Sequence, residues 1–206
     1  MIARGVAIAV HSARANSTSS LRSGMLAAAM EKRSHLGMAG HYAAMSEFLY
    51  RGYNVAVPAV DIGDDVYVVE DQVGTMWRLQ VKTSDAPEAH AGTYQLSRRQ
   101  LREIKANELF FMFTIRWVGR WRFILIRRDQ LADIRDAFEQ ADRSGKPGRP
   151  PTAHADAKTD ALTLRIEWSN ADALGWGVSF APYLDRWPDT FPPNPDGPGA
   201  VKERGP

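Results

Sequence analysis

Cysteine is absent from the 206-residue chain. This absence excludes disulfide bonds, zinc sites built on thiolates, and catalytic thiols. It also suits a reducing compartment, so we expect a cytoplasmic protein.

Long apolar runs are absent as well. No stretch approaches the roughly 20 residues of a membrane span, so we expect no membrane partner. The apolar stretch at residues 2–10 is short and interrupted by Arg4, and no convincing cleavage site follows it. It therefore favours a disordered extension, or a true start at Met30 or Met38, over a targeting peptide.

Strong net charge is the third absence. The 26 basic and 24 acidic side chains leave a formal net charge of +2, which predicts only modest, salt-sensitive affinity for DNA.

Two basic clusters stand out, one within residues 98–105 and one within residues 116–128. Such clusters can bind phosphates, and a solvated helix or hairpin face explains each cluster equally well when it is taken alone. We take the first cluster, on a helix that Ser97 is expected to cap, as the candidate nucleic-acid-binding surface. Its members are Arg98, Arg99, Arg102 and Lys105.

Composition divides the chain into a core and flanking segments. Residues 1–36 show little periodicity and residues 188–206 are rich in Pro and Gly, so we expect disordered tails at both ends. The core spans residues 37–140. Residues 141–160 have the composition of a flexible linker, and residues 161–187 add a strand and a helical turn.

The core mixes helical and strand patterns, which predicts an α/β protein. Apolar residues at helical spacing, ended by Gly52, predict a helix over residues 39–51. Two apolar runs at residues 109–117 and 121–127 predict a hairpin whose strands are covered on both faces. Strict alternation over residues 161–168 predicts a half-exposed strand at the edge of a sheet.

The stretch at residues 55–84 organises the core. Two Val-rich runs are separated by a short acidic turn that contains Gly74, which predicts neighbouring strands. Side chains alternate along a strand, so Gln80 and Lys82 share one face. If the strands pair, Asp65 comes close to Lys82. A carboxylate and a lysine held together at the edge of a sheet form a candidate metal and water site.

Three motifs in this order resemble the PD-(D/E)XK nuclease superfamily. They are the helix and strand of residues 39–58, the turn Asp61-Ile-Gly-Asp-Asp65, and the strand Arg78-Leu-Gln-Val-Lys-Thr-Ser84. The likeness covers residues 39–138 and looks closest to small endonuclease-like proteins whose third motif is Gln-x-Lys. It implies a restriction-endonuclease-like mixed β-sheet flanked by helices.

The resemblance also implies an activity, the hydrolysis of phosphodiester bonds in DNA with Mg²⁺ or Mn²⁺. A divalent cation acidifies water and stabilises charge on the phosphate, and Mg²⁺ takes oxygen ligands from one or two carboxylates. Asp65 would be the central ligand, and Lys82 would orient the attacking water or stabilise the transition-state charge. Gln80 and the carbonyl of Val81 offer further oxygens, and Glu47 matches a glutamate that completes the acidic cluster.

Among the three aspartates of the turn, Asp65 is favoured over Asp61 and Asp64 because it directly precedes the apolar strand, and Asp61 could instead cap a turn.

Two departures from the family's motifs, at His41 and at Gln80, keep an alternative function open. Where many relatives have Gly-Glu, this chain has Gly40-His41. Since neither His41 nor Gln80 supplies a negative charge, the site is less acidic than a full nuclease cluster, although His41 can coordinate a metal when neutral. The alternative is a catalytically weakened module that binds nucleic acid or a protein partner without cleavage.

The positions of Asp65, Glu47 and Lys82 distinguish these two functions. Convergence of the three on one polar pocket favours the nuclease, and scattering favours the binding module. On a helical wheel His41 lies roughly 120° from Glu47, so the two are not expected to point equally well at one ion. A homodimer across an exposed strand or hairpin is compatible with either function.

Overall fold

The computed structural model describes residues 34–60, 63–71, 74–85, 90–104, 108–143 and 160–186. Residues 34–36, expected in the N-terminal tail, belong to a helix over residues 34–50. The rest of that tail, the C-terminal tail, residues 144–159 of the predicted linker, Asp61 and Lys105 lie outside the described residues.

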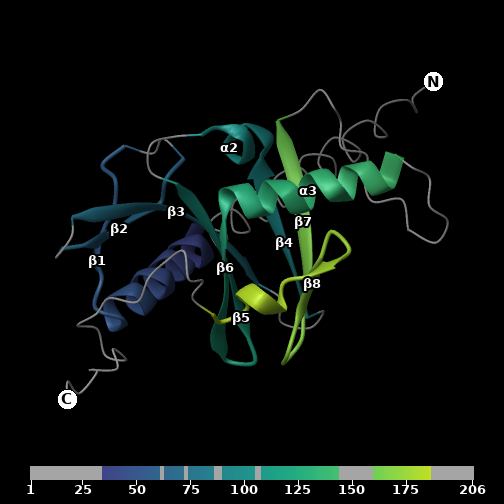
Figure 1. Cartoon of the computed structure of the whole chain (residues 1–206). Helices are drawn as coiled ribbons and strands as arrows, with labels where there is room; N and C mark the ends of the chain where they lie inside the picture. The colour runs from purple at the N-terminus through teal and green to yellow at the C-terminus, as the bar shows by residue number, and fades with distance from the viewer. Residues whose placement is uncertain are drawn as a thin grey trace, which may run out of the picture.

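A five-stranded sheet lies at the centre of the fold, in the order β1-β2-β3-β5-β6 (Figure 1). β3 and β5 run parallel, and the other neighbouring pairs are antiparallel. The predicted mixed sheet is therefore confirmed. The strands are β1 (Asn54–Ala56), β2 (Val66–Glu70), β3 (Thr75–Asp85), β5 (Leu109–Trp117) and β6 (Arg120–Arg127).

A second sheet of four strands has the order β4-β7-β8-β9. Its strands are β4 (Ala91–Ser97), β7 (Ala161–Trp168), β8 (Ala173–Gly175) and β9 (Val178–Ser179). Buried and exposed positions alternate along β7 as predicted, but the edge position predicted for this strand is wrong. β7 lies between β4 and β8, because an alternating pattern reports one buried face and carries no information about neighbours within the sheet.

The helices cover different parts of the two sheets. Helix 34–50 packs on one face of the five-stranded sheet, where Ala44 and Phe48 meet Val81 and Met112 in one apolar cluster. The opposite face packs against the second sheet and α3 (Arg128–Arg143). Short helices α2 (Arg98–Arg102) and η1 (Ala181–Tyr183) complete the described elements. Within the described residues no helix is long and apolar enough to cross a membrane.

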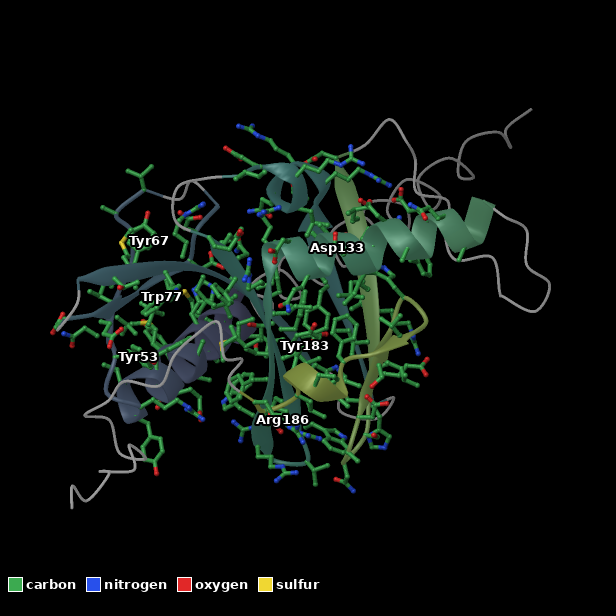
Figure 2. The ribbon with its side chains drawn as sticks, in the orientation of Figure 1. Tyr53, Tyr67, Trp77, Asp133, Tyr183 and Arg186 are labelled. Atoms are coloured by element: carbon green, nitrogen blue, oxygen red, sulfur yellow. The ribbon has the colours of Figure 1, made fainter. Side chains whose placement is uncertain are left out.

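β5 is buried along both faces, which confirms the expectation from its continuous apolar sequence. It joins β6 through Val118 and Gly119, both at positive φ (49° and 77°), as a tight hairpin turn requires. Tyr53, which follows helix 34–50, meets Trp77 of β3 edge to face with ring centroids 5.9 Å apart (Figure 2). This aromatic contact fixes the end of helix 34–50 against the sheet.

Gly40 allows helix 34–50 to approach the sheet closely. A Cβ at this position would lie inside van der Waals contact with Thr83 Oγ1, and 2.8 Å from Thr114 Oγ1. These two threonines hydrogen-bond to each other at 3.0 Å, so neither turns away freely. The close approach sets the position of the next residue, His41.

We expect Gly40→Ala to lower the free energy of unfolding by about 1–3 kcal/mol, because the added methyl overpacks this contact. Gly37→Ala is the matched control in the same helix, since nothing lies within 4 Å of a Cβ there. It should raise stability by about 0.5–1 kcal/mol through helix propensity. Urea unfolding of both variants measures the difference, and equal stabilities would contradict the close packing at Gly40.

Candidate functional site

The candidate site lies where β2 and β3 separate. Their pairing begins at Val66 and Leu79, whereas β3 continues to Asp85 beside β5. Asp65 immediately precedes β2, and its backbone N–H donates to the carbonyl of Leu79 at 2.8 Å. This bond holds Asp65 beside the stretch of β3 that carries Gln80 and Lys82.

The Asp65 carboxylate closes the edge of β3 that β2 leaves open. Its Oδ2 accepts hydrogen bonds from the backbone N–H of Val81, at 2.7 Å, and from the side-chain Nε2 of Gln80. His41 Nε2 lies 3.5 Å from the same oxygen, and the Asp65 side chain is 14% exposed. The structure therefore brings Asp65, Gln80 and Val81 together and adds His41 from the helix.

The carbonyl of Val81 faces the same open edge. In a β-strand the N–H and C=O of one residue point to the same neighbour, and the N–H of Val81 points at Asp65. Lys82 follows on β3, half-buried, and shares the face of Gln80. Its backbone carbonyl points the other way, toward β5, and accepts from Thr114 Oγ1 at 3.4 Å.

Gln100 is a member of this site that the sequence analysis did not identify. Its Nε2 donates to Gln80 Oε1 at 2.8 Å and to the carbonyl of Gly63 at 3.2 Å. α2 positions it, because Ser97 caps that helix as predicted and accepts from the backbone N–H of Gln100 at 3.2 Å. The cap predicts where Gln100 lies along α2, but no local pattern connects it to β3.

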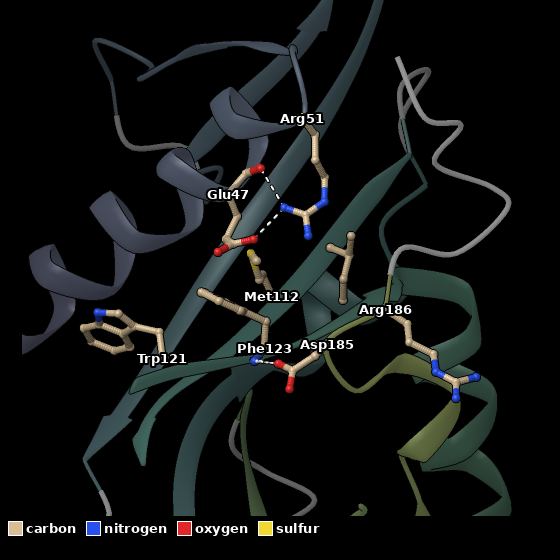
Figure 3. A pocket seen from close by; sticks show the side chains of 8 residues that line it. Glu47, Arg51, Met112, Trp121, Phe123, Asp185 and Arg186 are labelled. Atoms are coloured by element: carbon tan, nitrogen blue, oxygen red, sulfur yellow. Dashed lines mark hydrogen bonds and ion pairs between the residues drawn. The ribbon is translucent and has the colours of Figure 1, made fainter. Parts of the chain in front are cut away.

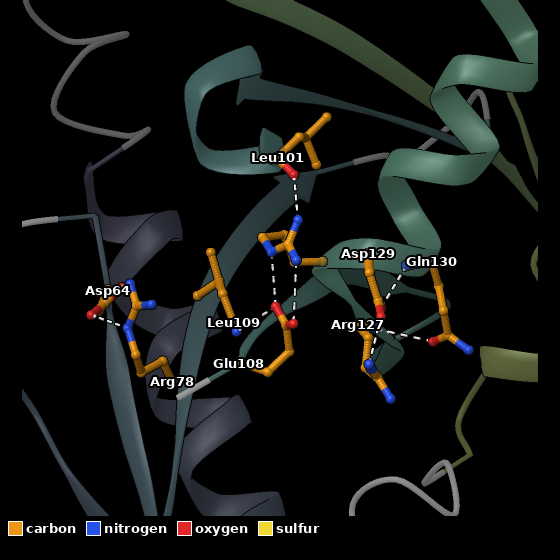
Figure 4. A network of polar contacts seen from close by, with 9 residues as sticks. Asp64, Arg78, Leu101, Glu108, Leu109, Arg127, Asp129 and Gln130 are labelled. Atoms are coloured by element: carbon orange, nitrogen blue, oxygen red, sulfur yellow. Dashed lines mark hydrogen bonds and ion pairs between the residues drawn. The ribbon is translucent and has the colours of Figure 1, made fainter. Parts of the chain in front are cut away.

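Asp64 has a different role from Asp65. It is 2% exposed and accepts from Arg78 through Nε, at 2.7 Å, and through Nη2 (Figure 4). The hydrogen bond that Arg78 donates to Asp64 is the main reason that the pKa of Arg78 is raised above its ordinary value. A carboxylate fully engaged by a buried guanidinium holds the fold and is not free to receive a cation.

Glu47 is not brought to the site. It pairs with Arg51 and lines a separate pocket that does not include His41 or Asp65 (Figure 3). Seven other residues line this pocket: Arg51, Met112, Trp121, Phe123, Leu125, Asp185 and Arg186. The angular separation expected from the helical wheel explains this placement. Across the described residues no three His, Cys, Asp or Glu side chains gather in a group that could hold a metal.

The donor set at Asp65 fits a weakly held divalent cation. One carboxylate, the peptide carbonyl of Val81 and the amide oxygen of Gln80 are hard oxygen donors, and the His41 imidazole is a further ligand when neutral. Mg²⁺ commonly keeps several waters and takes one or two carboxylates plus substrate phosphates. The residues fit such an ion, and they do not fit one enclosed by protein ligands alone.

The predicted basic cluster is only partly available to phosphates. Arg98 is 17% exposed and pairs with Glu139 at 2.9 Å, and Arg135 pairs with the same carboxylate at 2.7 Å. Burial alone would raise the pKa of Glu139, but the hydrogen bonds from these two arginines outweigh it and lower that pKa. Arg99 is 80% exposed and lies 3.7 Å from Glu103. Arg102 is also exposed.

A polar network anchors α2 to the rest of the fold. Arg128, at the start of α3, donates to the carbonyl of Leu101 at 2.7 Å and to Glu108 at 2.8 Å. Asp160 accepts from the Ser97 hydroxyl and from the backbone N–H of Arg99. These hydrogen bonds hold its pKa below the ordinary value. The helix that carries Gln100, Arg99 and Arg102 is therefore fixed at both ends.

Comparison with solved structures finds a weak structural likeness. No protein-family model matches the chain, and no curated protein matches it. A solved structure of a bacterial homing endonuclease, I-Ssp6803I, is similar with a TM-score of 0.35 and 21% sequence identity. The likeness covers 48% of this chain and 72% of that one. The strand order and register of the two sheets define the fold of this chain.

Proposed function

We propose that this chain is a divalent-metal-dependent endonuclease that hydrolyses phosphodiester bonds in DNA on a PD-(D/E)XK type of fold. One observation carries the proposal: the Asp65 carboxylate is hydrogen-bonded to both Gln80 and Val81, at the point where β2 and β3 separate. The aspartate and the Gln-x-Lys motif, which are 15 residues apart in sequence, meet at one sheet edge.

The cation would be held by Asp65, with the Val81 carbonyl, Gln80 and His41 as additional donors. When bound, it supplies Lewis acidity toward water and phosphate. The residues of the chain have their own roles. The backbone N–H of Val81 orients the carboxylate, and the Lys82 ammonium stabilises negative charge on the phosphate oxygens.

DNA binding is proposed for the exposed side of α2. Arg99 and Arg102 extend into solvent from the same short helix that carries Gln100. Phosphate contacts of this kind position the duplex without reading its sequence. Arg98 contributes less, because Glu139 already neutralises its charge.

A second candidate function is a module that binds nucleic acid or a protein partner without cleavage. The position of Glu47 favours it, because that carboxylate pairs with Arg51 and adds no charge at Asp65. Cytoplasmic location and a homodimer remain predictions under either function.

Cleavage of supercoiled, linear and branched DNA, with Mg²⁺ or Mn²⁺, tests the proposal. We expect cutting of at least one substrate, and a rate lower by about 10²-fold in Lys82→Met, the size of effect seen when one charge-stabilising donor is removed. Arg120→Met removes a charge at the exposed hairpin turn and should leave the rate unchanged. Wild-type cleavage by Lys82→Met would overturn the role of Lys82. Binding without cutting by a folded wild type would establish the second candidate.

A further inference from the structure

A chain of two side-chain amides connects α2 to Asp65. Gln100 Nε2 donates to the carbonyl of Gly63, at 3.2 Å, and to Gln80 Oε1, at 2.8 Å. Gln80 Nε2 in turn donates to Asp65 Oδ2. This series of hydrogen bonds therefore begins at a peptide carbonyl and ends at a carboxylate, and both of these groups accept hydrogen bonds only.

The Gly63 carbonyl and the Asp65 carboxylate, at the two ends of this series of hydrogen bonds, set the direction of both amides. Since the Gly63 carbonyl requires a donor, Gln100 presents its nitrogen there. The same nitrogen requires an acceptor from Gln80, so Gln80 turns its oxygen toward Gln100 and its nitrogen toward Asp65. Gln80 is only 5% exposed, so water does not substitute freely for either partner.

This direction opposes the binding of a cation at Asp65. A divalent cation needs oxygen donors, and here an N–H group faces the Asp65 carboxylate. If the Gln80 amide turned over, its oxygen would face the carboxylate, an arrangement that is unfavourable without a cation and favourable with one. The Gln80 nitrogen would then face the Gln100 nitrogen, so Gln100 would also turn and release the Gly63 carbonyl.

We propose that Gln100 is a positioning residue that holds the Gln80 amide nitrogen toward Asp65, and that a divalent cation at Asp65 reverses both amides. This inference rests on the cation site of the proposed function. The hydrogen bonds that Gln100 donates add a free-energy cost to cation binding, because they must break when the amides reverse. Gln100 therefore determines metal affinity without contacting the metal.

Mn²⁺ affinity, measured by calorimetry on the full chain, tests this role without reference to activity. Gln100→Met removes both donated hydrogen bonds at similar length, and we expect about threefold tighter binding of Mn²⁺. Gln100→Glu places an acceptor opposite Gln80, so the Gln80 nitrogen turns toward it. We expect about tenfold tighter binding for this variant, equivalent to about 1.4 kcal/mol. Gln95→Glu adds the same charge on an exposed position of β4 and should bind Mn²⁺ like wild type.

A structural role alone predicts the opposite sign, because loss of a supporting contact would loosen Asp65 and weaken Mn²⁺ binding. Weaker or unchanged binding by Gln100→Met would overturn the role of Gln100 and leave the proposed function standing. Absence of Mn²⁺ binding in wild type and in all variants would overturn both.

Nuclear magnetic resonance of the side-chain amides gives a second measurement. Titration of wild type with Mg²⁺ should shift the Gln80 and Gln100 side-chain amide signals together, and Asp65→Asn should abolish both shifts. A shift at Gln80 with Gln100 unmoved would contradict the coupled reversal.

Discussion

A chain with Asp65→Asn should fold like wild type and cleave DNA about a thousandfold more slowly, or not at all. The asparagine oxygen still accepts hydrogen bonds from Val81 and Gln80, so the edge of β3 stays capped. What is lost is the single negative charge that, in the proposed function, attracts the cation. Removal of one catalytic group commonly costs about 10²–10⁴ in rate, and in the proposed function Asp65 is the central ligand of the cation.

Single-turnover cleavage and thermal unfolding, made on the same preparation, check this prediction. The expected result is a melting temperature within a few degrees of wild type and a loss of cleavage that excess Mg²⁺ does not restore. Cleavage near the wild-type rate by folded Asp65→Asn would show that another carboxylate holds the cation.

Asp64→Asn should have the opposite outcome, with stability lost and cleavage kept. We expect a loss of about 3 kcal/mol in the free energy of unfolding. Asp64 is 2% exposed and Arg78 is 8% exposed, so the variant leaves a guanidinium buried without its counter-charge. Breaking a buried ion pair by removing one partner costs about 3–5 kcal/mol. The asparagine oxygen can still accept a hydrogen bond from Arg78, which places our expectation at the lower end of this range.

Urea unfolding of Asp64→Asn, with Asp65→Asn as the matched control, measures this difference. The two substitutions make the same chemical change at adjacent positions, so any difference arises from their surroundings. At temperatures where Asp64→Asn remains folded, its rate of cleavage should stay within a fewfold of wild type. Equal stabilities for the two variants would contradict the separation of roles.

The sequence predicts the separation of these aspartates only in part. Burial alternates from Asp64 to Glu70, so Asp64 shares the parity of the buried valines Val66 and Val68. Asp65 falls on the opposite, less buried side of this alternation, which agrees with the preference for Asp65 over Asp64 as the candidate ligand. The partner of Asp64 was not predicted, because Arg78 is 14 residues away and an arginine in a strand is more often solvated.

Local patterns predict local structure well in this chain. The Val118-Gly119 turn, the Ser97 cap and the alternation along β7 each depend on a few neighbouring residues, and each is present. The edge position predicted for β7 is wrong because strand order depends on β4 and β8, whose pairing no short window contains.

Side-chain partners across the fold are the part that sequence patterns miss. Gln100 is 20 residues from Gln80 and 37 from Gly63 along the chain, and nothing in the spacing of these residues indicates contact. The placement of Glu47, in contrast, follows from a sequence pattern. Helix geometry already predicts that Glu47 and His41 diverge, and the structure puts Glu47 in a pocket with Arg51 and Asp185.

Incubation of supercoiled DNA with the wild-type chain, in Mg²⁺ and in excess chelator, tests the central claim most directly. We expect nicked and linear products with Mg²⁺, none with chelator, and none from folded Asp65→Asn. Cleavage that persists in chelator, or intact DNA with folded wild type in both Mg²⁺ and Mn²⁺, would contradict a metal-dependent nuclease built on Asp65.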